Sequence, residues 1–381
     1  MKAVWNFIRK EPMLPVSALA ALLSLFITPP TPALLSDIDW RTLATLFMML
    51  TVLEGFKKEN IFRPVLQLSG RIGTMAGLSL FLVFSVFFTS MFVTNDVSLI
   101  IFVPLTIILF RAGDKEKFIL PVITMENIAA IRGSMLTPFG SPQNLFIYGR
   151  SGVSALEFVG YMFPLWLLSG VLIVGFVLAL YWKDIRMKTD IQNTSCAGEW
   201  LPERRAHRAA YAVMFLLVIA VIVSRTEYYL PVAAVVAGSV LIVDKTILAK
   251  TDYVLLLTFG CFFVFSSSVA GNQEIASFLR EAVRGHEYAW SILLSQVISN
   301  VPAAIVLYPF SENTGALLYG LDSAGLCSVI GSLASVINYR IYVREYPGKS
   351  KQFFLVFTLL SLAFFALVAV PGYFLSQQRV L

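Results

Sequence analysis

Four polar side chains, Thr94, Asn95, Asp96 and Ser98, lie together in an otherwise apolar part of the sequence. An Asn between two helices can cap a helix N-terminus or direct its carbonyl oxygen at an ion. A carboxylate such as Asp96 is costly inside a membrane, so it predicts a cation ligand or a protonatable coupling group, with a helix cap as the structural alternative. This cluster is the first candidate ion or substrate site.

The same pattern occurs again in the second half of the chain, at Ser299 and Asn300. In both places a Ser or Thr precedes the Asn, and a proline follows nine residues after the Asn, at Pro104 and Pro309. A polar, helix-breaking motif that occurs once in each half predicts a duplicated transporter with its site between the halves.

A second kind of motif interrupts the apolar segment 118–148. The run from Gly133 to Asn144 contains Pro138 and Pro142, which remove backbone donors, and Gly140, which lets the backbone turn or approach a ligand. We expect two half-helices whose free N-terminus suits an anion and whose free oxygens suit Na⁺; a proline kink needed only for packing is the alternative. Residues 326–332 match 135–141 position by position. The candidate ligands in the two breaks are Ser134, Thr137, Gly140, Ser141, Asn144, Ser328, Gly331, Ser332 and Ser335.

Two charged residues lie within the interrupted segments. Arg132 could attract an anionic substrate or pair with Glu126, although a separation of six residues is not a favoured spacing on a helix. Asp322 is either a second titratable group or the start of a span near the membrane surface. Both residues are candidates for a role in charge balance or coupling.

Composition places the chain among polytopic membrane proteins. Of its 381 residues, 57% are hydrophobic and only 14% are charged, and the apolar segments are long enough to cross a bilayer. The net charge of +6 does not indicate nucleic acid binding, because the basic residues gather in particular loops. The three cysteines are far apart and the two histidines lie in or beside polar loops, so neither a disulfide scaffold nor a His or Cys metal centre is expected.

Motifs of energy-consuming or hydrolytic enzymes are missing from the sequence. There is no Walker A motif and no zinc-protease or serine-hydrolase motif. We therefore expect no enzyme activity and no cofactor other than a bound Na⁺, and transport driven by an ion gradient.

The order of apolar segments predicts an all-α membrane fold with two repeats. The expected segments are 13–29, 41–56, a re-entrant hairpin at 74–110, an interrupted span at 118–148, 158–182, 209–224, 229–243, 253–269, a hairpin at 288–311, an interrupted span at 315–340, and 352–375. With a cytoplasmic N-terminus, most Lys and Arg residues fall on the cytoplasmic side. The two hairpins then enter from opposite sides, which predicts inverted-topology repeats; full spans in place of the hairpins are the alternative.

This topology divides the chain into three parts. We expect a first repeat half at 1–182, a basic cytoplasmic linker at 183–208 and a second repeat half at 209–381, all within one membrane domain.

These motifs resemble the ion transporter superfamily that includes arsenite pumps, NhaD-type Na⁺/H⁺ antiporters, citrate carriers and sodium–dicarboxylate symporters. The resemblance covers roughly residues 40–345 and rests on Thr94-Asn-Asp96, the Gly133–Asn144 run, Ser299-Asn-Val-Pro302 and Ile330–Ser335. The Asn-Val-Pro form is nearer the arsenite-pump and NhaD branch. The resemblance implies one half-site at Thr94, Asn95 and 137–144, another at Ser299, Asn300 and 328–335, and a homodimer in the inner membrane.

Together these observations predict a secondary active transporter of a small ion. An inorganic or organic anion coupled to Na⁺ or H⁺ by alternating access is the main hypothesis, and a Na⁺/H⁺ antiporter is the alternative within the same architecture. A membrane sensor or structural protein that no longer transports is the alternative from another class.

Overall fold

The computed structural model describes residues 13–28, 32–189 and 204–377, which are almost entirely helical and contain no strand. The first half contains α2 (Met13–Ser24), α3 (Pro32–Asp37), α4 (Trp40–Lys58), α5 (Arg63–Leu68), α6 (Met75–Val93), α7 (Asn95–Ala112), α8 (Ile119–Ser134), α9 (Pro142–Ser151) and α10 (Ala155–Leu180). The second contains α11 (Arg205–Ser224), α12 (Tyr229–Asp244), α13 (Thr246–Lys250), α14 (Tyr253–Gly271), α15 (Gln273–Val283), α16 (Glu287–Ile298), α17 (Asn300–Leu307), α18 (Thr314–Ala324), α19 (Leu333–Glu345) and α20 (Ser350–Ser376). The predicted all-α class is confirmed.

Long apolar helices make this a multi-pass membrane protein. The helices α6, α7, α10, α11, α14 and α20 are each long and apolar enough to cross a membrane. The legs of the two predicted hairpins differ in length, because α6 and α7 have 19 and 18 residues whereas α16 and α17 have 12 and 8. By length, the first pair fits full spans as well as a hairpin, whereas the second pair is too short to span.

Both predicted helix breaks are present. The first interrupted segment ends one helix at Ser134 and starts the next at Pro142, and the second ends a helix at Ala324 and starts the next at Leu333. The glycines in the two breaks are also tightly packed. A Cβ atom at Gly140 would overlap the Ser134 carbonyl, and a Cβ atom at Gly331 would overlap the Ala324 carbonyl. Only glycine fits at these two equivalent positions.

The same order of elements occurs twice along the chain. The helices α4 and α14 both have 19 residues and begin at an Asp N-cap, where Asp39 accepts from the Thr42 amide and Asp252 from the Leu255 amide, each at 2.9 Å. In each half a short helix follows, then two helices joined by a single residue (called a hairpin below for this helix pair alone), then a broken helix and a long final helix. The helix α11 has no counterpart in this pairing.

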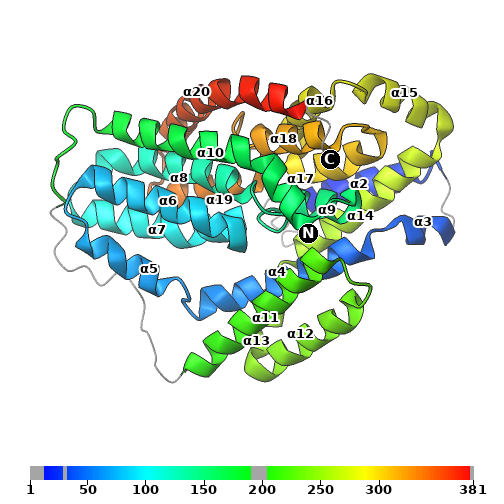
Figure 1. Cartoon of the computed structure of the whole chain (residues 1–381), viewed down its shortest axis with the longest axis horizontal. Helices are drawn as coiled ribbons and strands as arrows, with labels where there is room; N and C mark the ends of the chain where they lie inside the picture. Colours follow the sequence, from blue (N-terminus) through cyan, green and yellow to red (C-terminus); the bar gives the residue numbers. More distant parts are fainter. Residues whose placement is uncertain (1–12, 29–31, 190–203, 378–381) are drawn as a thin grey trace.

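The two halves interlock at their broken helices (Figure 1). The segment α8 packs against α6, α7 and α10, but its continuation α9 packs against α17 and α18 of the second half. The second broken helix crosses between the halves in the same way. Its segment α18 packs against α16 of the second half, whereas α19 packs against α7 and α8 of the first half. Similarly, α2 packs against α14, and α12 packs against α4. Any site at the breaks is therefore built from both halves.

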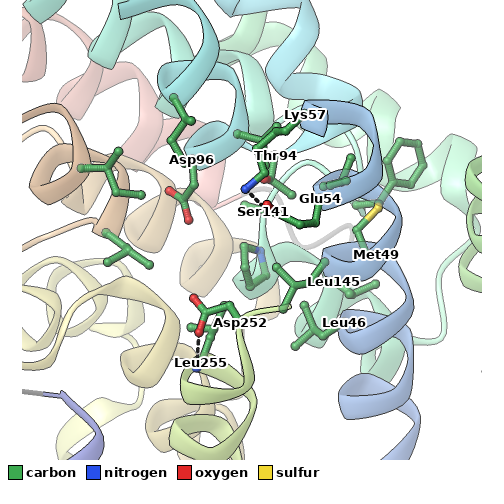
Figure 2. Close-up of a pocket in the computed structure, with 18 of the residues that line it drawn as sticks. Leu46, Met49, Glu54, Lys57, Thr94, Asp96, Ser141, Leu145, Asp252 and Leu255 are labelled. Atoms are coloured by element: carbon green, nitrogen blue, oxygen red, sulfur yellow. Dashed lines mark hydrogen bonds and ion pairs between the residues drawn. The ribbon is translucent and has the colours of Figure 1, made fainter. Parts of the chain in front are cut away.

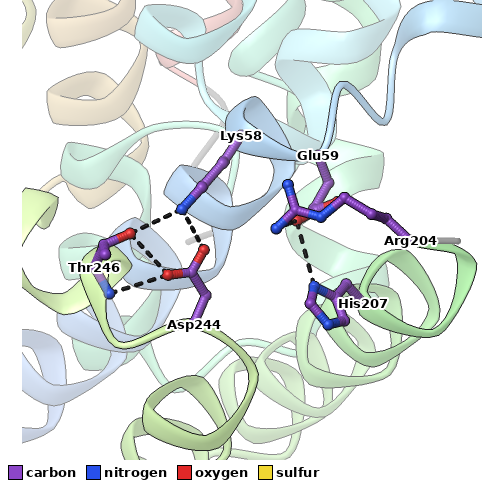
Figure 3. Close-up of polar contacts among 6 residues, drawn as sticks. All are labelled: Lys58, Glu59, Arg204, His207, Asp244 and Thr246. Atoms are coloured by element: carbon purple, nitrogen blue, oxygen red, sulfur yellow. Dashed lines mark hydrogen bonds and ion pairs between the residues drawn. The ribbon is translucent and has the colours of Figure 1, made fainter. Parts of the chain in front are cut away.

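Ion pairs join the end of α4 to the end of α12 and to the start of α11, which begins at Arg205 within the predicted linker (Figure 3). Lys58 pairs with Asp244 at the end of α12, while the buried Glu59 pairs with Arg204 at 3.2 Å and contacts His207 at 3.8 Å. Residues 190–203 of the predicted linker and residues 1–12 of the predicted cytoplasmic N-terminus lie outside the described residues.

Candidate functional site

Both hairpin tips have the same strained backbone. Thr94 has φ 69° and ψ 154°, and Ser299 has φ 69° and ψ 160°, a region that glycine occupies and other residues avoid. Such a conformation costs roughly 1–3 kcal/mol per residue and persists only where its surroundings enforce it, which is typical of functional sites. The strain marks the two motifs that the sequence singled out.

Each hairpin is tied to the neighbouring break by an equivalent hydroxyl group. The Thr137 hydroxyl donates to the main-chain oxygen of Met91 on α6, and the Ser328 hydroxyl donates to Gln296 Oε1 on α16 at 2.6 Å. The main-chain N–H of Asn300 donates to the main-chain oxygen of Gly331 at 3.2 Å. Hairpin tip and break therefore form one unit in each half.

A cavity of about 370 Å³ opens at the first of these units (Figure 2). Three predicted site residues, Thr94, Asp96 and Ser141, line it together with α4, the start of α14 and the start of α19. The carboxylate of Asp96 points into the open space toward Asp252 on α14 (Figure 2). The cavity is therefore bounded by both halves of the chain.

The lining of this cavity carries charges of both signs. The acidic residues are Glu54, Asp96 and Asp252, and the basic residues are Lys57 and Lys250. Glu54 and Lys57 pair with each other one turn apart on α4. One oxygen of Asp96 is buried without a hydrogen-bond partner among the described residues. Lysines suit an anion, and the carboxylates suit an accompanying cation.

A cavity of about 320 Å³ lies at the second hairpin tip. Ser299 lines it, while Asp252, Leu255 and Leu333 line both this cavity and the first one. The residues at the starts of α7, α9, α17 and α19 thus all face one or the other cavity. Helix N-termini present unpaired N–H groups and a partial positive charge, which favours an anion.

Arg132 and Asp322 form a buried cluster that lines neither cavity. Arg132 Nε donates to Ser169 Oγ at 2.9 Å, and its Nη1 donates to the main-chain oxygen of Asp322 at 3.2 Å. The Asp322 carboxylate accepts from Gln143 Nε2 at 3.0 Å and, with the amide oriented to satisfy both groups, from Asn144 at 3.2 Å. Arg132 thus contacts Asp322 rather than Glu126, and the cluster joins α8 and α9 to α18.

The other predicted residues lie behind the cavity walls. Asn95 and Asn300 are buried and line none of the described cavities, although each adjoins a lining residue. Ser98 donates to the Thr94 oxygen at 3.0 Å, and Ser134 donates to the Ile131 oxygen at 3.2 Å. Ser335 accepts from Asn127 at 3.0 Å, while Ser332 precedes α19 as its N-cap.

Sequence reasoning missed the four other charged residues of the first cavity, namely Glu54, Lys57, Lys250 and Asp252. They lie at helix ends far from either motif, where charged residues are common. The one available signal was the repeated Asp N-cap before an apolar run, at Asp39 and Asp252. Among the described residues, no group of three or more His, Cys, Asp or Glu side chains is arranged to hold a metal ion.

Comparisons with known proteins find relatives that cover most of the chain. An Escherichia coli K12 protein described as inner membrane protein YbiR is 28% identical over 365 residues, which cover 93% of this chain and 92% of the relative. The uncharacterized transporter MJ0456 of Methanocaldococcus jannaschii is 29% identical over 309 residues, covering 80% of this chain and 81% of the relative. The family model described as citrate transporter, CitMHS, matches residues 4–331. The chain therefore belongs to the CitMHS citrate transporter family and is a secondary membrane transporter.

Proposed function

We propose that this chain carries a small organic anion bearing carboxylate groups across the membrane, coupled to the movement of Na⁺ or H⁺. The observation that supports this most is the first cavity, in which Lys57 and Lys250 lie with the N-termini of α7, α9 and α19. The lysines and the helix N-termini offer positive charge to an anion. The name of the family agrees with a carboxylate substrate.

In this proposal Asp96 takes the coupling ion. Its carboxylate lies within the cavity at a strained hairpin tip, and one of its oxygens has no partner among the described residues. A cation bound there would balance part of the substrate's negative charge, so that the two ligands would bind more tightly together than apart.

The proposed route is alternating access between inverted repeats, 1–182 and 209–381, joined by the linker 183–208. The matched caps of α4 and α14, the matched tips and the matched breaks support a duplicated architecture. Exchange of the conformations of two such repeats moves a central site from one side of the membrane to the other. A homodimer with a cytoplasmic N-terminus completes the proposal.

A Na⁺/H⁺ antiporter is the second candidate. It is favoured by the acidic residues of the cavity, which outnumber the lysines. The narrower resemblance to the arsenite-pump and NhaD branch fits both candidates, because that branch includes oxyanion pumps as well as Na⁺/H⁺ antiporters.

Uptake into proteoliposomes tests these functions. The purified chain is reconstituted, a Na⁺ or pH gradient is imposed, and uptake of radiolabelled citrate, other carboxylates and inorganic oxyanions is measured. We expect gradient-driven carboxylate uptake with a higher KM in Lys57→Gln and Lys250→Gln, and no change in the exposed control Lys351→Gln.

The outcomes separate the candidates. Na⁺-dependent proton movement without anion uptake would replace the proposal by the antiporter. A folded protein that moves none of these ions would favour the non-transporting sensor.

A further inference from the structure

A second polar cluster is buried where α7, α8 and α19 meet, away from the cavities. It consists of Thr106 on α7, Glu126 and Asn127 on α8, and Ser335 and Asn338 on α19, and each of these residues is 0% exposed. None of them lines the two cavities at the hairpin tips. A carboxylate and two amides in such a dry position call for a physical explanation.

Hydrogen bonds link these side chains across the three helices. Asn127 Nδ2 donates to Ser335 Oγ at 3.0 Å, and Asn338 Nδ2 donates to the Ile123 oxygen at 2.7 Å. In an α-helix the main-chain oxygen of Ile123 also accepts a hydrogen bond from the main-chain N–H of Asn127. The Asn338 side chain therefore lies beside Asn127. Glu126, the adjacent residue on α8, accepts from the Thr106 hydroxyl through Oε1.

Three acceptor oxygens in this cluster receive no hydrogen bond from the described residues. Glu126 Oε2, Asn127 Oδ1 and Asn338 Oδ1 are buried and have no hydrogen-bond partner in the described part of the chain. Arg132, the nearest cation along α8, instead donates to Ser169 and to the Asp322 oxygen. An ionised carboxylate and two amide oxygens without donors are together an unfavourable arrangement unless a positive charge lies between them.

We propose that Glu126, Asn127 and Asn338 bind a single monovalent metal cation, with Na⁺ as the ion that fits best. Carboxylate and amide oxygens are ligands for hard cations, and the one carboxylate balances one positive charge. A proton on Glu126 would neutralise the carboxylate but leave both amide oxygens unpaired. A divalent ion would leave a buried charge uncompensated.

The location of the proposed ion lets it hold the two halves of the chain together. The helix α8 belongs to the first half of the chain and α19 to the second half, so the ion joins the two broken helices directly. An ion that binds only when α8 and α19 are in contact stabilises that arrangement of the halves by its binding free energy.

Thermal melting of the purified full-length chain tests the site without any transport assay. Melting is followed in NaCl and in choline chloride at constant ionic strength and pH, for the wild type and Glu126→Gln, with the exposed Glu274→Gln as the matched control. We expect Na⁺ to raise the melting temperature of the wild type and the control. In Glu126→Gln the affinity for Na⁺ should fall at least about tenfold, since changing even outer-shell partners causes such losses at metal sites.

The variants are chosen so that folding does not decide the result. Glu126→Gln keeps the volume of the side chain and removes its charge, so this variant should fold and melt in choline at or above the wild-type temperature. Asn338→Ala keeps the Glu126 carboxylate. It should raise the Na⁺ concentration needed for half-saturation and reduce the rise in melting temperature that Na⁺ causes.

Three outcomes would overturn the proposal. One is a Na⁺ increment that persists unchanged in Glu126→Gln, and another is an increment that disappears in Asp96→Asn instead, which would place the ion at the hairpin tip. The third is a melting temperature that responds to pH through Glu126 but not to Na⁺, which would assign the carboxyl a proton. Because no substrate is added, these results are independent of whether the cavity carries an anion.

Discussion

Two cavities occupy equivalent places in the two halves of the chain, and they differ in what they reach. The first, already described, lies between α4, α7 and α19. The second of this pair is a separate cavity of about 360 Å³, not the one that Ser299 lines, and lies between α14, α17 and α9. Residues that lie equally far along the chain from the Asp N-caps of α4 and α14 line the two cavities. These matched pairs are Leu50 and Phe263, Leu53 and Ser266, Glu54 and Ser267, and Lys57 and Ala270.

Only the first of the two cavities extends to a hairpin tip and a break. It is lined by Thr94, Asp96 and Ser141, whereas the lining of the second contains neither Ser299 nor Ser332. Arg150, at the edge of the second cavity, is ion-paired with Asp39 at 3.0 Å. Equivalent backbones thus surround one cavity that reaches the central motifs and one that stops short of them, as expected of an alternating carrier in one of its two states.

The largest expected effect is loss of transport when either tip Asn is removed. Asn95→Ala and Asn300→Ala should each reduce proteoliposome uptake to background while the protein still inserts and purifies, because each residue starts the second helix of a hairpin directly after the strained tip. The exposed Ser277→Ala is the control. Wild-type uptake in one of the two variants would break the functional equivalence of the halves.

The next effect concerns the buried cluster that joins the halves. Arg132→Met should lower the free energy of unfolding by about 1–3 kcal/mol, because it leaves the Asp322 main-chain oxygen without its donor and removes a positive charge near the buried Asp322 carboxylate. Adding Asp322→Asn should restore part of the loss, since the double variant carries no unbalanced charge. Chemical denaturation of the four proteins measures this, and strictly additive losses would show that the two charges do not interact.

The two breaks can be compared through their glycines. Gly140→Ala and Gly331→Ala should each cost roughly 1–3 kcal/mol, because the added methyl overlaps a carbonyl at the end of the preceding half-helix. Gly175→Ala on α10, where a methyl meets nothing within 4 Å, should be neutral or stabilising. A large loss at one break and none at the other would mean that the two breaks are packed differently.

The smallest effect separates the two caps. Asp39→Asn keeps the cap but removes the charge that faces Arg150, so it should cost about 0.2–1 kcal/mol, and high salt should reduce that cost. In Asp252→Asn the loss of stability should be smaller, because the residue of α19 that matches Arg150 is Ile341. Its effect should appear in transport, since Asp252 faces the first cavity. Equal losses of stability at both caps would contradict this comparison.

Much of this architecture could be predicted from local sequence. The breaks follow from Pro138, Pro142 and the glycines, since proline and glycine act on the backbone where they stand. The hairpin tips were found from the repeated Ser/Thr-Asn pair. The predicted residues Thr94, Asp96 and Ser141 do share one cavity.

What could not be predicted depends on contacts between distant segments. Nothing near Arg132 in sequence indicates that it reaches Asp322 on the other broken helix, or that Ser335 pairs with Asn127. Likewise, Lys57 and Asp252 are ordinary residues at helix ends until the packing of α4 and α14 places them in one cavity.

The most direct test of the central claim is the accessibility of one introduced cysteine in each of the two cavities. Leu50→Cys and Ala270→Cys are made in a chain whose three native cysteines are replaced, and a membrane-impermeant maleimide is applied to each side of proteoliposomes. Alternating access between inverted repeats predicts labelling from opposite sides, with substrate and coupling ion raising one rate while lowering the other. Labelling of both from the same side, or rates that do not change in opposite directions, would contradict it.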